Sequence, residues 1–175
     1  SMGLTPVEGL MMGTRTGDLD LGAFIFIMEK EDMNLNEGKS LINKKSGMLG
    51  ITGVSSDMRE IREEAANGNE RAKLGLEMYD YRVRKYIGAY TAAMDGVDLI
   101  VFTGGIGEND WECREGTLKG LSYLGVDFDP EKNKEVRGEE KVITSDKSKV
   151  TSIIVPTNEE LVIARDTEEI VSNNQ

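Results

Sequence analysis

Apolar residues recur at two spacings along the chain, and the alternation between these spacings predicts an α/β protein. From Leu76 to Met94 they return every three or four residues, which predicts a long helix with one buried face. Residues 98–103 and 150–155 are instead short, almost continuous apolar runs, which are typical of buried strands in a parallel sheet. Because helical and strand patterns alternate, we expect helices to flank the sheet.

Capping and turn residues set the bounds of the shorter predicted elements. Thr5, followed by proline, favours a helix start, and we expect that helix to end at Gly13. Asp57 is a candidate cap for a helix that ends near residue 67. Residues 46–56 are small and glycine-rich and predict a loop with room for a short strand. Further helices are predicted at 21–28, at 34–45, after residue 109 to about 124 and after residue 158 to about 171, further strands at 126–128 and 141–144, and a frayed tail at 172–175.

The composition removes several kinds of catalytic chemistry. The chain has no histidine, which excludes serine–histidine and cysteine–histidine nucleophiles and most catalytic zinc sites. Cys113 is the one cysteine, so no disulfide can form within the chain, and we interpret it as an inert helix residue. This cysteine usage suits a reducing cytoplasm. The remaining chemistry has to use carboxylates, arginine, lysine and backbone amides, with or without a hard metal ion.

Length and charge limit the architecture and the partners. A chain of 175 residues suits one ordinary domain, no apolar run is long enough to span a membrane, and no signal peptide opens the sequence. Lys and Arg number 21 against 32 Asp and Glu, and the net charge of −11 argues against nucleic acid or an anionic membrane as the main partner. A phosphate ligand stays compatible with this charge, because a glycine loop, one arginine and a metal ion can hold it locally.

Residues Gly104–Asn109, with the sequence GGIGEN, follow the first predicted strand and precede a predicted helix. Glycines at such a turn let backbone amides approach a ligand, and a helix start favours anions. The segment lacks the complete glycine patterns of the common phosphate-binding and dinucleotide-binding loops. The structural alternative is a tight turn in which Asn109 caps the helix together with Glu112, and the residues alone leave both interpretations open.

Two further polar segments each have a functional and a structural interpretation. Arg15 lies between glycines in GTRTGD, and arginine suits planar recognition of phosphate, whereas the alternative is a surface ion pair with Asp18 or Asp20. In SSDMR, the structural interpretation makes Asp57 a helix cap and Arg59 a solvated helix residue.

A third segment, PTNEE, comes at the end of the second apolar strand, where ligands gather in open α/β sheets. Thr157 and Glu160 have the spacing of a capping box, which gives Glu160 a structural role. Glu159 has no such role and is freer to hold a metal ion. The alternative for Glu159 is a favourable acid in the first turn of a helix.

Five segments, in this order along the chain, resemble the acetate kinase family: SMGLTPVEGLMMGTRTGD, KKSGMLGITGVSSDMR, YIGAYTAAM, VDLIVFTGGIGEN and IIVPTNEELVIARDT. The resemblance extends from Ser1 to about Val171. GTRTGD together with PTNEEL is specific to acetate, propionate and butyrate kinases, whereas GGIGEN is shared with a wider superfamily of sugar kinases, chaperones and actin. GDLDLG departs from the usual GDIDP of the family, which affects the expected geometry just after Arg15.

The resemblance implies a ribonuclease-H-like α/β fold, with a mixed sheet flanked by helices, and phosphoryl transfer from ATP to acetate with Mg²⁺. It implies that Arg15 stabilises the phosphoryl group in flight and that Glu159 helps to place the Mg²⁺ ion. Such roles suit phosphoryl transfer, which depends on positioning and on charge stabilisation. The nucleotide-binding residues implied by the resemblance are Asp57, Met58, Arg59, Gly105, Ile106, Gly107, Glu108 and Asn109, the last five forming an adenosine loop.

The resemblance also implies that residues 1–175 are a single nucleotide-binding domain, the C-terminal half of the enzyme, and that the N-terminal domain is absent. The absent half would carry the acetate-binding arginine, a catalytic aspartate and the phosphate-contacting histidine. We therefore expect a cytoplasmic homodimer that binds ATP or ADP and is inactive alone. Two alternatives remain: a non-catalytic dimerisation or assembly module, and half of a propionate or butyrate kinase.

Overall fold

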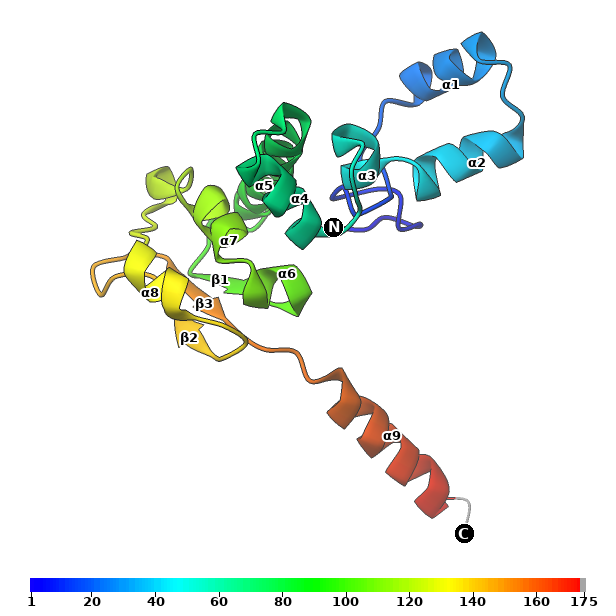
Figure 1. Ribbon diagram of the computed structural model, residues 1–175. Helices are drawn as coiled ribbons and strands as arrows, with labels where there is room; N and C mark the ends of the chain where they lie inside the picture. Colours follow the sequence, from blue (N-terminus) through cyan, green and yellow to red (C-terminus); the bar gives the residue numbers. More distant parts are fainter. Residues whose placement is uncertain (174–175) are drawn as a thin grey trace. The chain divides into compact units, whose positions relative to one another are not determined.

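The computed structural model describes residues 1–173, and the chain divides into two compact units (Figure 1). Unit 1 contains Ser1–Val97 together with Gly116–Leu121. Unit 2 contains Asp98–Glu115 and the chain from Ser122 onward. Of the tail that was predicted to fray, residues 172–173 belong to the last helix, and residues 174–175 lie outside the described part.

Unit 1 is built from helices whose starts are capped by side chains. Asn34 and Glu37 form a capping box at the second helix, and the Asp57 carboxylate accepts the Arg59 amide at the fourth. The helices predicted between residues 21 and 45, after Asp57 and around Leu76 are therefore confirmed. Their bounds are α1 (Leu21–Lys30), α2 (Leu35–Lys44), α3 (Gly47–Thr52), α4 (Met58–Ala66) and α5 (Glu70–Ala93).

The core of unit 1 lies where α5 packs against α3 and α4. Gly75 of α5 allows a close approach there, because a Cβ atom at this position would lie 2.6 Å from the Thr52 methyl group. The C-terminal end of α5 is more exposed, with Tyr90 at 48% and the cap residue that follows the helix, Met94, at 61%. The prediction of one buried face along the whole helix is therefore wrong for this end. The buried apolar residues of this core are Met11, Met48, Ile61 and Ala72.

The helix predicted between Thr5 and Gly13 is absent, and the segment forms an irregular loop. Gly9 has a φ of +115°, which a helix cannot accommodate. Its carbonyl accepts the amide of Asp18 at 2.9 Å, so the segment bonds to a distant part of the chain rather than to its own next turn. This prediction is wrong because the competing partner is not local in sequence.

Residues 46–56 also differ from the prediction, because they contain the short helix α3 instead of a loop. The first amides of a helix have no partner inside it. In α3 the amides of Met48 and Leu49 donate to the carbonyls of Met12 and Gly13, each at 2.9 Å. These bonds to the N-terminal segment supply what a capping side chain would otherwise provide.

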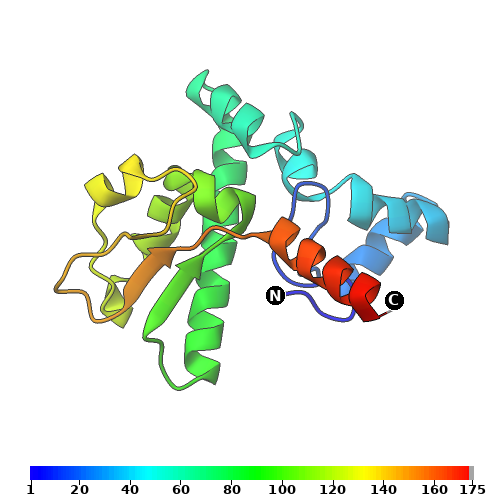
Figure 2. The ribbon, with the colours of Figure 1, turned by 90° about the horizontal axis from the view of Figure 1, so that it is seen from below.

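Unit 2 contains a three-stranded mixed sheet in the order β1 (Leu99–Phe102), β3 (Thr151–Ile154) and β2 (Lys141–Val142). β1 and β3 are parallel and pair in register along their whole length, whereas β2 is antiparallel to β3. Figures 1 and 2 both show β1 and β3 side by side. The predicted α/β class with a mixed sheet is confirmed.

Only one face of β1 is buried. Ile100 and Phe102 point into the unit, whereas Leu99 is 52% and Val101 46% exposed. The prediction that this apolar run is buried on both faces is therefore wrong within unit 2. The carboxyl ends of β1 and β3 nevertheless lie at one edge of the sheet, as expected for a parallel pair.

The helices of unit 2 are short except for the last one. The helix predicted to reach residue 124 ends at Leu118, and a 3₁₀ turn at Ser122–Leu124 follows it. Every described side chain of the last helix is exposed. Among the described residues no helix combines the length and apolar character that a membrane crossing needs. The helix bounds are α6 (Gly104–Asn109), α7 (Trp111–Leu118, which ends in unit 1), α8 (Pro130–Glu135) and α9 (Glu159–Asn173).

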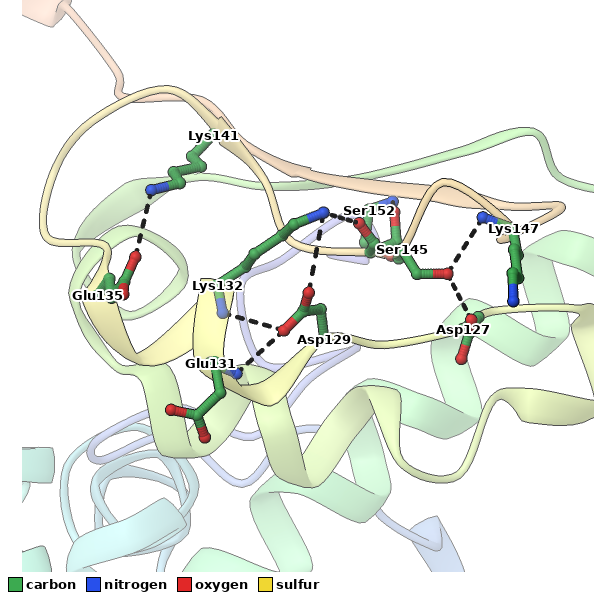
Figure 3. Close-up of polar contacts among 10 residues, drawn as sticks. Asp127, Asp129, Glu131, Lys132, Glu135, Lys141, Ser145, Lys147 and Ser152 are labelled. Atoms are coloured by element: carbon green, nitrogen blue, oxygen red, sulfur yellow. Dashed lines mark hydrogen bonds and ion pairs between the residues drawn. The ribbon is translucent and has the colours of Figure 1, made fainter.

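Polar side chains hold the segment between α7 and β3 (Figure 3). Asp129 caps α8, a helix that was not predicted, and the Ser145 hydroxyl donates to the Asp127 carboxylate. The strand predicted at 126–128 is reduced to one isolated bridge to Thr144. Side-chain hydrogen bonds and a helix cap therefore fix this segment in place of a regular strand.

Candidate functional site

Backbone hydrogen bonds fix the loop that carries Arg15 against α2 and α3. The Ser46 amide donates to the Thr14 carbonyl at 3.0 Å, and the Thr16 amide donates to the Ile42 carbonyl at 3.1 Å. Gly47, with a φ of +62°, lies so close to the loop that a Cβ atom there would be 2.6 Å from the Arg15 carbonyl oxygen. The loop is thus held by its own backbone on both sides of Arg15.

The Arg15 side chain itself has few partners. Its Nη1 atom donates to the Met12 sulfur at 3.6 Å, which is a weak bond. Its Nε atom is buried and has no hydrogen-bond acceptor among the described residues. The alternative ion pair with Asp18 or Asp20 is wrong, because Asp18 pairs elsewhere and Asp20 caps α1. A guanidinium held this way keeps hydrogen-bonding capacity for an incoming anion.

Asp18 anchors the end of this loop to α5, a role that sequence reasoning missed. Its carboxylate accepts the Tyr86 hydroxyl at 2.8 and 2.9 Å and the Gly9 amide at 2.9 Å, and it pairs with Arg82 at 2.8 Å. Burial opposes ionisation of Asp18, but these donors and the charges of Arg82 and Lys85 outweigh it and hold its pKa below the usual range. Burial and the bond to Asp18 raise the pKa of Tyr86 to about 12.

Unit 1 brings the Arg15 loop next to the turn that precedes α4. A Cβ atom at Gly13 would lie 2.9 Å from the Ser56 carbonyl oxygen, so glycine is required for this contact. A Cβ atom at Gly17, which has a φ of +71°, would likewise lie 2.5 Å from the backbone nitrogen of Met11. Both glycines therefore serve contacts within the protein.

Asp57 and Arg59, both predicted to bind nucleotide, form a local pair. Arg59 donates from Nε to Asp57 Oδ1 at 3.0 Å and from Nη2 to Oδ2 at 2.6 Å, while its side chain is 91% exposed. The side-chain and backbone hydrogen bonds from Arg59 lower the pKa of Asp57 to about 2. Met58, between them, is half-buried against the core of unit 1. Asp57 therefore caps α4 and Arg59 is a solvated helix residue, as the structural interpretation of SSDMR predicts. The outer face of Arg59 stays accessible.

In unit 2, Glu108 ties the two loops at the carboxyl end of the sheet to each other. Its Oε1 atom accepts the Gly104 amide, the Thr157 amide and the Thr157 hydroxyl, each at 2.9 Å. The two bonds from Thr157, followed by the bond from Gly104, hold the pKa of Glu108 below its usual range. This carboxylate already occupies the start of α6, so the segment presents a surface better suited to an uncharged ligand group than to phosphate.

Two capping predictions in unit 2 are wrong. Asp110, not Asn109, caps α7 by accepting the Cys113 amide at 3.0 Å. Asn158, not Thr157, caps α9 by accepting the Leu161 amide at 3.0 Å. Thr157 is engaged by Glu108 instead, and Glu160 therefore has no part in a capping box.

The glycines of GGIGEN have different surroundings. A Cβ atom at Gly107 would lie 3.2 Å from the carbonyl carbon of Phe102, so this glycine serves packing against β1. A Cβ atom at Gly105 would meet no heavy atom within 4 Å, and the residue is exposed. Packing within the unit therefore does not explain a glycine at 105. A ligand that approaches the backbone closely would explain a glycine at this position.

Glu159 begins α9 and is exposed, two residues beyond the contact between Thr157 and Glu108. Within residues 1–173, no group of three or more His, Cys, Asp or Glu side chains could by itself hold a metal ion. A single exposed carboxylate nevertheless fits Mg²⁺, which commonly takes one or two protein carboxylates and completes its shell with phosphates and waters.

The predicted site residues thus fall into two groups, one in each unit. Unit 1 brings Arg15 together with the Asp57–Arg59 turn, and unit 2 brings Gly104–Asn109 together with the turn before Glu159. Unit 1 also has a cavity of about 450 Å³ beside Asp18 and α1, and none of the predicted site residues lines it.

Comparisons with known proteins give one consistent family. A model of the acetokinase family matches residues 1–165. The acetate kinase of Bacteroides thetaiotaomicron is 58% identical over 171 residues, which is 98% of this chain and 43% of that protein. The chain therefore spans less than half the length of the curated relatives that it matches.

Solved structures give the same result. The crystal structure of Porphyromonas gingivalis acetate kinase matches with a TM-score of 0.93 and 56% identity, covering 98% of this chain and 43% of that chain. A propionate kinase from Francisella tularensis matches with a TM-score of 0.85 and 41% identity, covering 94% of this chain and 41% of that chain.

Proposed function

Because the chain belongs to the acetokinase family, we propose that residues 1–175 act as the C-terminal, nucleotide-binding half of an acetate kinase. The complete enzyme would transfer the γ-phosphoryl group of ATP to a carboxylate oxygen of acetate, giving acetyl phosphate and ADP. Both compact units would belong to this one functional domain. The N-terminal half would supply the acetate-binding groups, so the chain alone would bind nucleotide without turning it over.

Arg15 is proposed to stabilise the phosphoryl group during transfer. The observation that supports this most is its guanidinium, which has a weak bond to sulfur and a buried Nε without an acceptor among the described residues. Phosphoryl transfer places negative charge on the equatorial oxygens, and a planar donor with free hydrogen-bonding capacity stabilises that charge. The rigid backbone on both sides of Arg15 would limit the cost of positioning it.

Gly105–Asn109 are proposed to form the adenosine side of the nucleotide site. The open space at Gly105 supports this role, because a purine or ribose can approach a backbone that carries no side chain. The carboxylate of Glu108 at the start of α6 also favours an uncharged group there over a phosphate. Asp57, Met58 and Arg59 of unit 1 are proposed to bind nucleotide as well, because the outer face of Arg59 is exposed.

Glu159 is proposed as the contribution of this chain to a Mg²⁺ site. The ion, when bound with nucleotide, would neutralise charge on the phosphates. The exposed carboxylate of Glu159 can reach a ligand without breaking any hydrogen bond found in unit 2 among the described residues. Substitution by glutamine should weaken the Mg²⁺ dependence of nucleotide binding and leave the metal-free affinity unchanged.

Acetate is the proposed acceptor, because two of the matched acetate kinases, at 58% and 56% identity, are more similar to this chain in sequence than the matched propionate kinase, at 41%. We also propose a homodimer formed through this half. Exposed side chains on α5, with Tyr81 at 59% and Tyr90 at 48%, support an interface there. Sedimentation velocity at micromolar concentration should give a dimer, and a monomer would contradict this part.

Calorimetry and an enzyme assay on the same preparation test the proposal. Titration of the chain with Mg-ADP, near millimolar concentration, should give heat that saturates at one site. Acetyl phosphate should not form from ATP and acetate with the chain alone, but it should form after the purified N-terminal half of an acetate kinase is added. Absence of nucleotide heat would contradict the binding claim. Acetyl phosphate formed by the chain alone would overturn the claim that the second half is needed.

A further inference from the structure

Arg114 is the largest fully buried side chain among the described residues, at 0% exposure. It lies on α7, the helix that follows the GGIGEN segment. Arginine is rarely buried completely, because its donors lose water and then need acceptors inside the protein. A buried arginine directly beneath a proposed ligand loop therefore needs an explanation beyond packing.

The guanidinium of Arg114 joins two separate elements of unit 2. Nη1 donates to the carbonyls of Gly107 and Glu108 in α6, both at 2.9 Å. Nε donates to the Asn133 side-chain oxygen at 2.7 Å, and Nη2 donates to the Asn133 carbonyl at 3.1 Å. One edge of the fork thus holds the last turn of α6, and the other edge is fixed in α8.

Asn133 is itself fixed and buried. Its exposure is 0%, and its side-chain amide donates to the Trp111 carbonyl at the start of α7, at 2.8 Å. Arg114 therefore reaches α6 from an anchor that α7 and α8 already hold. These four hydrogen bonds are to neutral oxygens, so they orient carbonyl groups, and the carboxylate of Asp110 adds a favourable charge interaction with the guanidinium. A cation at the C-terminal end of α6 is also electrostatically favourable.

We propose that Arg114 is the positioning residue of the nucleotide loop: by holding the carbonyls of Gly107 and Glu108, it keeps the backbone at Gly105 in the orientation that accepts adenosine. This inference rests on the proposed function of Gly105–Asn109. Arg114 does not touch the ligand and acts only through α6. Lysine cannot replace it, because one ammonium on a flexible stem cannot reproduce a planar fork that serves α6 and Asn133 together.

The test compares Arg114→Lys with a matched control, Arg84→Lys, in the full 175-residue chain. Arg84 also donates from Nη2 to a backbone carbonyl of α7, that of Gly116 at 2.6 Å, but both residues belong to unit 1, whereas α6 belongs to unit 2. Calorimetric titrations use Mg-ADP and AMP, well below the melting temperature of each variant. Both substitutions should lower the melting temperature.

Only Arg114→Lys should raise the Kd, by about tenfold, which corresponds to about 1.4 kcal/mol. The factor should be the same for Mg-ADP and AMP, because both carry the adenosine that meets Gly105. A purely structural role would lower the melting temperature and leave the Kd of the folded protein unchanged. A folded Arg114→Lys variant with a Kd within twofold of the wild type would therefore overturn the inference.

A second variant decides the matter if Arg114→Lys does not fold. Asn133→Ala removes one anchor of the fork while Arg114 keeps its bonds to α6, so the Kd should rise by a smaller factor than with lysine at 114. An unchanged Kd for folded Asn133→Ala would overturn the inference. If the wild-type chain binds no nucleotide, the proposed function fails and this inference fails with it, whereas binding that is insensitive to both variants refutes the inference alone.

Discussion

Arg15→Met gives the sharpest prediction about how the site is built, because the substitution should harm activity without harming the fold. The buried Nε of Arg15 has no acceptor among the described residues, and an unsatisfied buried donor costs about 1–3 kcal/mol. The bond from Nη1 to the Met12 sulfur, at 3.6 Å, returns only about 0.5 kcal/mol of this. Since Arg15 is half-buried, we expect the net effect of methionine on unfolding to lie between zero and a gain of about 1 kcal/mol.

Arg71→Met is the matched control in the same unit. Arg71 donates to the carbonyls of Ile51 and Gly50 at 2.8 and 3.0 Å, where it caps the end of α3. Loss of these two exposed bonds should destabilise the chain by about 1 kcal/mol. Thermal unfolding then separates the two variants, because 1 kcal/mol shifts the melting temperature by about 2–4 °C in a chain of this length.

The functional half of the prediction uses the complete enzyme. Arg15→Met should lower kcat by about 10³-fold or more and change the KM for ATP far less, which is the pattern of a group that acts in the transition state. A loss of stability from Arg15→Met as large as that from Arg71→Met would refute the reasoning, because Nε would then have a partner. An unchanged kcat with a raised KM would make Arg15 a ground-state binder instead.

Three further predictions follow from the same contacts. Tyr86→Phe should lower the free energy of unfolding by about 1 kcal/mol, because the hydrogen bond to Asp18 is lost. The pKa of Tyr86 is raised to about 12 in the folded state, so the wild type should lose stability as pH rises from about 10 through 12 and the variant should not. Equal alkaline melting curves for the two proteins would contradict this. Glu108→Gln should reduce the loss of stability below about pH 4.5. The lowered pKa of Glu108 gives stability that is present above the unfolded pKa and is lost as pH falls through the folded pKa. An acid unfolding curve identical to that of the wild type would show that the bonds of Glu108 to Thr157 and Gly104 add no stability. Gly105→Ala should leave the melting temperature unchanged or slightly raised while weakening nucleotide binding, whereas Gly107→Ala should lower the melting temperature, and the reverse order would show that Gly105 serves packing.

Elements with local signals could be predicted from the sequence. The capping box of Asn34 and Glu37 and the cap at Asp57 lie within a few residues of the amides that they satisfy, so the starts of α2 and α4 are readable. The helix expected after Thr5 fails because Gly9 bonds to Asp18 instead, and α3 was missed because its first amides are satisfied by Met12 and Gly13. These partners are distant in sequence, so a pattern of a few neighbouring residues does not predict them.

The same distinction holds for the candidate site. Motifs identify Arg15, Glu108 and Glu159, but their surroundings depend on residues far along the chain. Glu108 is bound by Thr157, 49 residues away, and this contact joins two segments that the sequence could only list separately. The missing acceptor of Arg15 Nε is a property of packing, and no local spacing predicts it. Asp18 and Arg114 were missed because their roles come from α5 and α8.

The central claim is that this chain binds nucleotide through GGIGEN and the Asp57–Arg59 turn. An amide-resolved NMR titration of the isotope-labelled chain with Mg-ADP tests it most directly, because each amide reports its own surroundings. The account predicts saturable shifts at Gly105–Asn109 and at Asp57–Arg59, with the amides of α1 unchanged. Saturable shifts confined to other residues, or no shifts at millimolar Mg-ADP, would contradict it.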